Sequence, residues 1–116
     1  MGKPVVHFEI TGKNAAKLQQ FYANTFDWKI DTNNPMDYGM VAAGGSGGIG
    51  GGVGSSGEGP AGVTFYIQVD DLQATLNQVE KAGGKTVMPP MDLPGGPSLA
   101  QFTDPEGNRI GLVVGM

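Results

Sequence analysis

The sequence contains no cysteine, only one histidine and only one tryptophan among its 116 residues. Without cysteine, the chain cannot form a disulfide framework, a thiolate zinc site or a cysteine nucleophile. The lone histidine excludes any metal centre that needs two imidazoles. A chain of this length with 39% apolar residues can still bury a core without disulfides or a structural metal ion. We therefore expect a single domain over residues 1–116.

Basic residues are also few, since seven Lys and Arg stand against eleven Asp and Glu, for a formal net charge of −4. These basic residues are scattered along the sequence and form no cluster that could bind a phosphate backbone. We therefore expect no nucleic-acid partner. The start of the chain, MGKPVVHFEI, lacks the pattern of a targeting signal. No apolar run approaches the roughly 20 residues that span a bilayer. We expect no membrane partner, and a cytoplasmic location is the default.

Glycine, by contrast, is abundant, and the stretch GGSGGIGGGVGSSGEG over residues 44–59 is built mainly from it. Residues 52–57 fit the spacing G-x-G-x-x-G, but a strand pattern follows instead of the helix whose amides would bind a pyrophosphate. Ile49 and Val53 interrupt the glycines as anchors would, which a pure linker lacks. We expect a closing strand at 47–53 and a link at 54–62. Glycine in a strand marks the close approach of a ligand or of another backbone.

Hydrophobic periodicity predicts the same order of elements in each half of the chain. VVHFEI alternates as a strand, and a helix with Asn14 as its N-cap follows to residue 26. GVTFYIQV is the matching strand, and the helix after it has Asp70 and Gln73 as a capping box and Gly83 as its stop. Short strands are expected at WKID, YGMVAA, KTVM, SLAQFT and RIGLVV, with DPEGN as a turn. The sequence therefore predicts two copies of a βαβββ module, over residues 4–53 and 63–116.

Alternation along the two long strands separates an apolar face from a polar one. Val6, Phe8 and Ile10 share the face that must meet a helix, which leaves His7 and Glu9 on the other. The second strand repeats this pattern at an offset of 57 residues, and its polar face carries Thr64, Tyr66 and Gln68. These polar faces either line one concave pocket or form the solvent side of an open sheet, and periodicity alone favours neither.

The segments HFEI, FYANTFDWKI, FYIQVDDLQATLNQVEKAGGKTVMPPMDLPG and FTDPEGNRIGLV, in this order around the glycine tract, resemble the vicinal oxygen chelate superfamily. That superfamily includes glyoxalase I, bleomycin-resistance proteins and extradiol dioxygenases. The resemblance covers nearly the whole chain and is closest to glycine-rich, glyoxalase-like members. It implies an α+β fold in which two βαβββ modules form a half-open mixed-sheet barrel around a cavity. It also implies a homodimer.

Metal-dependent members of that superfamily take ligands from four strand positions, and the resemblance carries these onto this chain. His7 matches the first position. The second falls in the glycine tract, the third on Thr64 and the fourth on Gly111, none of which offers the usual ligand. A divalent catalytic metal needs about three protein ligands, whereas His7 and Glu9 supply at most two. We therefore expect no metal and no cofactor.

The leading hypothesis is a metal-free protein that binds a small organic molecule in the cavity between the modules. The candidate contacts are His7, Glu9, Trp28, Tyr38, Thr64, Tyr66, Gln68 and Gly111. Two alternatives stay open. One is a lyase, isomerase or dioxygenase-type enzyme with an atypical metal site or with acid-base chemistry by His7 and Glu9, although no catalytic residue can be named. The other is a dimeric interaction module without a ligand.

Overall fold

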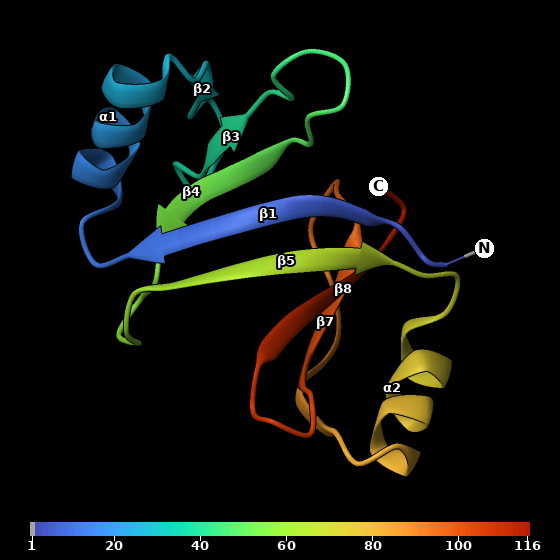
Figure 1. The fold of residues 1–116 in the computed structure, drawn as a ribbon. Helices are drawn as coiled ribbons and strands as arrows, with labels where there is room; N and C mark the ends of the chain where they lie inside the picture. Colours follow the sequence, from blue (N-terminus) through green and yellow to red (C-terminus); the bar gives the residue numbers. More distant parts are fainter. Residues whose placement is uncertain (1) are drawn as a thin grey trace. The chain divides into compact units, whose positions relative to one another are not determined.

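The computed structural model describes residues 2–116, which form two helices and eight strands (Figure 1). In chain order these are β1 (Val5–Gly12), α1 (Ala15–Phe26), β2 (Ile30–Asp31), β3 (Gly39–Val41), β4 (Gly51–Ser55), β5 (Gly62–Gln68), α2 (Leu72–Lys81), β6 (Lys85–Asp92), β7 (Ser98–Thr103) and β8 (Arg109–Val114). The chain divides into two compact units. The first unit is His7–Thr64, and the second unit joins residues 2–6 to Phe65–Met116.

The two units share one strand topology. In the first unit the strand order is β2-β3-β4-β1, with β4 parallel to β1 and antiparallel to β3. In the second unit the order is β6-β7-β8-β5, with β8 parallel to β5 and antiparallel to β7. Each unit also carries one helix, α1 against β4 and α2 against β6, β7 and β8. The α+β class and the duplicated βαβββ module predicted from the sequence are thereby confirmed.

Both helices begin at a side-chain cap, but only one cap is the expected residue. Asn14 caps α1 by accepting a hydrogen bond from the backbone N–H of Lys17 at 3.0 Å, as predicted. At α2 the cap is Asp71, whose Oδ1 accepts from the N–H of Ala74 at 2.9 Å. The predicted cap, Asp70, is wrong because its side chain points to solvent and pairs with Lys3 at 3.4 Å. Only Asp70 has a glutamine three residues later, as a capping box requires, but the helix begins at Leu72 and therefore takes Asp71 as its cap.

The apolar cores of the two units differ in depth. Helix α2 buries Leu72 and Leu76 against the sheet, where they meet Val69, Ala100 and Leu112. Helix α1 has no fully buried residue, and Phe21 and Phe26 remain more than half exposed. The first unit thus relies on half-buried aromatic rings and on close packing over its glycines.

The glycine tract folds as a loop followed by strand β4, which spans Gly51–Ser55 rather than the expected 47–53. Val53 is completely buried and acts as the anchor that the sequence suggests, whereas Ile49 is 44% exposed in the preceding loop. The strand begins later than expected because Gly45 and Gly47 adopt positive φ, which suits a turn and not a strand.

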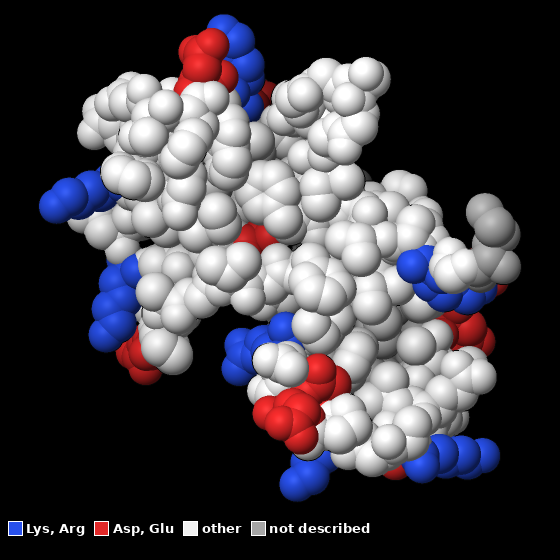
Figure 2. Space-filling model, viewed as in Figure 1, with Lys and Arg blue, Asp and Glu red and all other residues white. Residues whose placement is uncertain are grey.

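Charged side chains do not gather into a patch on the face drawn in Figure 2, where Lys and Arg stand singly and several have Asp or Glu beside them. Within residues 2–116, neither helix is long and apolar enough to cross a membrane.

Candidate ligand-binding site

The polar face of β1 carries a chain of three hydrogen-bonded side chains. His7 and Glu9 project from the same side of the strand, and the hydroxyl of Tyr38 lies between them. Tyr38 Oη donates to Glu9 Oε2 at 3.0 Å and lies 3.1 Å from His7 Nε2. The rings of His7 and Tyr38 are nearly parallel, with their centres 6.4 Å apart. The structure therefore brings together three of the residues that the sequence nominates.

The direction of these hydrogen bonds follows from counting protons. A phenol has one proton, and Tyr38 gives it to the carboxylate of Glu9. Towards His7 the phenol oxygen can then only accept, so Nε2 of His7 must carry a proton and donate it. In the neutral imidazole this leaves Nδ1 as the acceptor nitrogen. Tyr38 thus connects an imidazole to a carboxylate through a single oxygen atom.

The glycines of β4 make room for the Tyr38 ring. Gly52 pairs with Glu9 across the parallel strands, and a Cβ built on Gly52 would overlap the phenol of Tyr38. A Cβ on Gly54 would lie 2.7 Å from Cδ1 of the same ring. Gly51 points to the opposite face, where it lies under the ring of Phe8. The groups that lie close to these glycines are therefore aromatic rings of the same unit, whereas the sequence predicts a ligand or another backbone there.

His7 is a buried polar residue, with only 8% of its surface exposed. Burial removes water from the imidazole and disfavours its charged form, which lowers the pKa of His7 below its ordinary value of 6.5. The groups facing it in the hydrogen-bond chain are Tyr38 and Glu9. His7 is accordingly mainly neutral at pH 7, and its one ring proton is then on Nε2.

The lowered pKa of His7 predicts how the stability of the protein depends on pH. As the pH falls below about 6.5, the histidine of the unfolded chain takes up a proton before the folded one does. The free energy of unfolding should therefore be highest above pH 6.5 and fall as the pH drops through the lower pKa of the folded state. Urea unfolding of the wild type and of His7→Gln between pH 7.5 and 5.5 measures this. A slope that is equally steep in His7→Gln would show that other groups cause it.

The second unit holds three more of the nominated residues. Tyr66 is 4% exposed, and its hydroxyl accepts a hydrogen bond from Gln101 Nε2 at 3.0 Å. Its ring lies over Gly111, its partner across the parallel strands β5 and β8. Gln68 Nε2 donates to a backbone oxygen of Met116 at 3.1 Å. Thr64 is half-buried on β5, at the end of the first unit.

Trp28 lies apart from His7 and Glu9. Its ring packs against Phe8 at 5.3 Å, Tyr22 at 5.1 Å and Phe26 at 6.0 Å between ring centres. Phe8 projects from β1 on the face opposite to His7 and Glu9. Trp28 therefore belongs to the aromatic cluster beside α1, and we do not include it among the contacts of the polar face.

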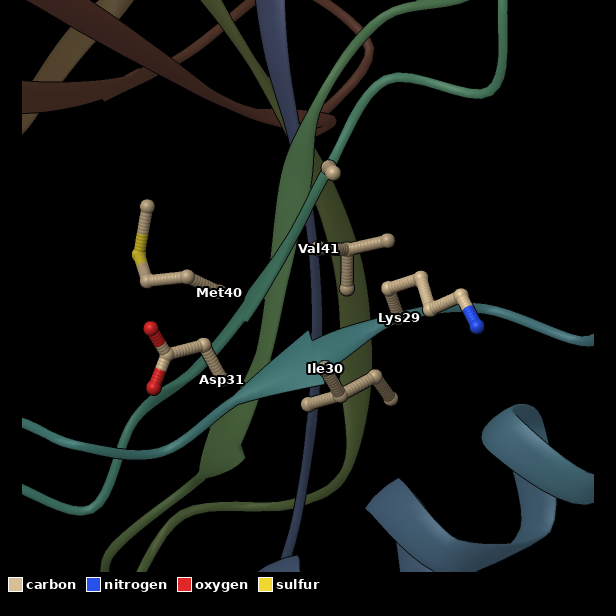
Figure 3. Close-up of a pocket in the computed structure, with 6 residues that line it drawn as sticks. Lys29, Ile30, Asp31, Met40 and Val41 are labelled. Atoms are coloured by element: carbon tan, nitrogen blue, oxygen red, sulfur yellow. The ribbon is translucent and has the colours of Figure 1, made fainter.

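An open pocket of about 490 Å³ lies elsewhere in the first unit, at the edge strand β2 and its neighbour β3. Its lining residues are Lys29, Ile30, Asp31, Met40, Val41 and Ala42, none of which the sequence nominates. Figure 3 shows the side chains of Asp31 and Met40 on one side of the two strands and those of Lys29 and Val41 on the other. The pocket wraps around a sheet edge and offers no converging set of polar groups.

The residues of the polar face do not fit the metal site that metal-dependent members of the superfamily are expected to have. Within residues 2–116, no three His, Asp or Glu side chains lie close enough to hold a metal ion together. The oxygen of Tyr38 already lies between His7 and Glu9. At Gly111, the fourth position, and at Gly52 in the glycine tract, tyrosine rings fill the space into which a side chain would project.

Sequence reasoning missed the residues that hold Tyr38 in place. Asn34 Oδ1 accepts from the backbone N–H of Tyr38 at 2.9 Å, and Asn34 Nδ2 donates to the Tyr38 carbonyl at 2.6 Å. The signal was the run TNNPMDY, in which an asparagine side chain can bond to the backbone a few residues later. The sequence predicts a turn there but does not show which asparagine makes these bonds.

Comparison with known proteins identifies one family. The family model described as the glyoxalase/bleomycin resistance protein/dioxygenase superfamily matches residues 5–112. A "glyoxylase-like domain-containing protein" of Didymella fabae is 35% identical over 108 residues, which cover 86% of this chain and 84% of that protein. The CFP32 protein of Mycobacterium bovis is 30% identical over 122 residues, covering 92% of this chain. The chain spans only 43% of the length of CFP32.

A solved structure has the same fold. The crystal structure of a glyoxalase/bleomycin resistance protein/dioxygenase superfamily member from Vibrio splendidus superposes with a TM-score of 0.64. The superposition covers 97% of this chain and 99% of that one, at 16% sequence identity. At this identity the likeness concerns the fold alone.

Proposed function

The chain belongs to the glyoxalase/bleomycin resistance protein/dioxygenase superfamily, and from this premise we propose that it binds a small organic molecule on the polar face of its first unit, without a metal ion. His7, Glu9 and Tyr38 are the proposed contacts. The observation that carries the proposal is their hydrogen-bond chain, in which a half-buried tyrosine joins a buried, neutral imidazole to a carboxylate. Convergent polar groups of this kind, set among apolar neighbours, are typical of sites for small ligands.

The chemistry of Glu9 indicates what the ligand should carry. Within residues 2–116, Glu9 forms no ion pair, and the one hydrogen bond to its carboxylate comes from Tyr38. A carboxylate can accept about four hydrogen bonds, so Glu9 has capacity left for a ligand. Its charge favours a donor group, such as the protonated amine of a small organic cation. The net charge of −4 acts in the same direction.

The donor set favours binding over metal-assisted catalysis. A catalytic divalent metal takes about three protein ligands and keeps one open position. The polar face of the first unit supplies one imidazole and one carboxylate, and both already bond to Tyr38. Elemental analysis of the purified protein tests this point. A stoichiometric divalent metal that disappears in His7→Ala would contradict the proposal.

A thermal-shift screen tests the binding proposal directly. A library of small amines, carboxylic acids and neutral aromatic compounds should contain amines that raise the melting temperature. Glu9→Gln should weaken the binding of such a hit about tenfold or more, because a hydrogen bond to a charged group contributes about 1.5–3 kcal/mol. Glu106→Gln, which removes one exposed charge in the second unit, is the matched control. The proposal fails if no compound binds, or if Glu9→Gln and His7→Gln both bind the hit as the wild type does.

A further inference from the structure

Strand β4 contributes no side chain that could hold the ring of Tyr38 lying on its glycines. Gly52 and Gly54 present bare backbone to the ring, so neither residue has side-chain atoms that could stop the phenol from sliding along the strand. The hydroxyl nevertheless lies 3.1 Å from His7 Nε2 and 3.0 Å from Glu9 Oε2. Because hydrogen bonds weaken steeply with misalignment, this geometry depends on where the backbone of Tyr38 lies.

Two amide side chains hold the backbone at that point. Asn34 bonds to both the N–H and the carbonyl of Tyr38, at 2.9 Å and 2.6 Å, and its Oδ1 also accepts from the N–H of Met36 at 3.2 Å. Gln19 reaches from α1 and donates to the carbonyl of Asp37 at 3.2 Å and to that of Val53 at 2.8 Å.

These bonds connect Tyr38 to the surface on which its ring rests. Val53 lies between the two glycines of that surface, so Gln19 ties the residue before Tyr38 to the surface itself. The connecting turn also needs support, because Asp37 has a φ of 51°, a left-handed conformation that costs an aspartate energy.

We propose that Asn34 and Gln19 are positioning residues of the ligand site, which place the Tyr38 hydroxyl where it can bridge His7 and Glu9. The inference rests on the proposed function, since it assigns these amides to the same site. Neither residue lies on the polar face of β1, and both act through the backbone around Tyr38. Loss of either should move the phenol away from the imidazole even in the absence of any ligand.

The lone histidine makes this measurable, because its imidazole nitrogens give one assignable set of NMR signals. In the wild type without ligand, the Nε2 proton should be protected from exchange by its bond to Tyr38. Asn34→Ala and Gln19→Ala should lose this protection and shift the imidazole ¹⁵N signals. The neighbouring exposed residues Asn33 and Gln20, changed to Ala, are matched controls and should keep the wild-type spectrum.

The outcome is independent of ligand binding. If Asn34→Ala fails to fold, Asn34→Asp serves in its place. It keeps the acceptor for the Tyr38 N–H but sets an oxygen against the Tyr38 carbonyl, and it should give the same loss of protection. Cooperatively folded Asn34 and Gln19 variants with wild-type His7 signals would overturn the inference while leaving a ligand that depends on Glu9 in place. Absence of any ligand would overturn the proposed function, and the NMR result would still decide whether these amides position Tyr38.

Discussion

Gly52→Ala should lower the free energy of unfolding by about 3 kcal/mol, at the upper end of the usual cost of overpacking. The added methyl group would overlap the phenol of Tyr38, and the backbone of β4 cannot retreat because Gly52 is paired on both sides. The ring must therefore move, which breaks the hydrogen bonds to His7 and Glu9. Urea unfolding monitored by circular dichroism measures the loss of stability, and the His7 NMR signals report the loss of the bridge.

Two controls distinguish this clash from a loss of stability that alanine would cause anywhere in the glycine tract. Gly44 has no atom within 4 Å of a built Cβ and does not adopt a positive φ, so Gly44→Ala should be neutral or slightly stabilising. In a Tyr38→Ala background the ring is gone, and Gly52→Ala should then cost almost nothing. Equal small effects of Gly44→Ala and Gly52→Ala in the wild-type background would contradict the structure.

Gly111→Ala should cost about 2 kcal/mol in the second unit for the same kind of reason. A Cβ on Gly111 would overlap the ring of Tyr66, which is 4% exposed and has little room to turn away. Displacement of the ring would also break the hydrogen bond from Gln101 to the Tyr66 hydroxyl. Denaturant unfolding gives the cost. The substitution should raise the rate of exchange of the amide protons along β8 as the strand loosens.

For Gly111→Ala, substitutions of Tyr66 show whether the loss of stability comes from the clash with the ring or from the lost hydrogen bond of the hydroxyl. Tyr66→Phe keeps the ring, so Gly111→Ala should remain costly in that background, whereas Tyr66→Ala should relieve it. Gly96→Ala is the matched change in the same unit, because its built Cβ has only an ordinary contact of 3.4 Å with Leu93. If Gly111→Ala cost no more than Gly96→Ala, the packing of Tyr66 on β8 would be wrong.

The strand partners of Gly52 and Gly111 also show why neither position can carry a side chain that binds a metal. Gly52 lies opposite Glu9 and Gly111 opposite Tyr66, and the sequence repeat of 57 residues sets Glu9 on Tyr66. The two glycines are thus equivalent positions of the duplicated module. In each unit a tyrosine ring covers this position, which explains physically why neither position can carry a ligand side chain.

Short stretches of the sequence are enough to predict strand faces, helix ends and a turn. Alternation in VVHFEI correctly separates Phe8 from His7 and Glu9, because successive side chains of a strand point to opposite faces wherever the strand lies. Asn14 as a cap and Gly83 as a stop follow from short-range hydrogen bonding and from the need for a positive φ. The motif DPEGN also forms its turn locally, with Asp104 accepting from the N–H groups of Glu106 and Asn108.

The site itself could be read only in part. His7 and Glu9 were found because they share a face of one strand, but the bridge between them comes from Tyr38, which is 29 residues beyond Glu9. No periodicity links Glu9 to Tyr38, since helix α1, strand β2 and a turn lie between them. The same limit applies to Trp28, whose aromatic character fits a ligand wall as well as the cluster beside α1, where it lies.

The sequence by itself determined the duplicated module and the polar and apolar faces of its long strands. These features depend on residue identity and on neighbours a few positions away. Only the tertiary structure decided that Asp71 and not Asp70 caps α2, where β4 begins, and that the bare glycines of β4 lie under the ring of Tyr38. Each of these depends on which distant groups meet in space, and the free energy of that packing is not encoded in any short segment of the chain.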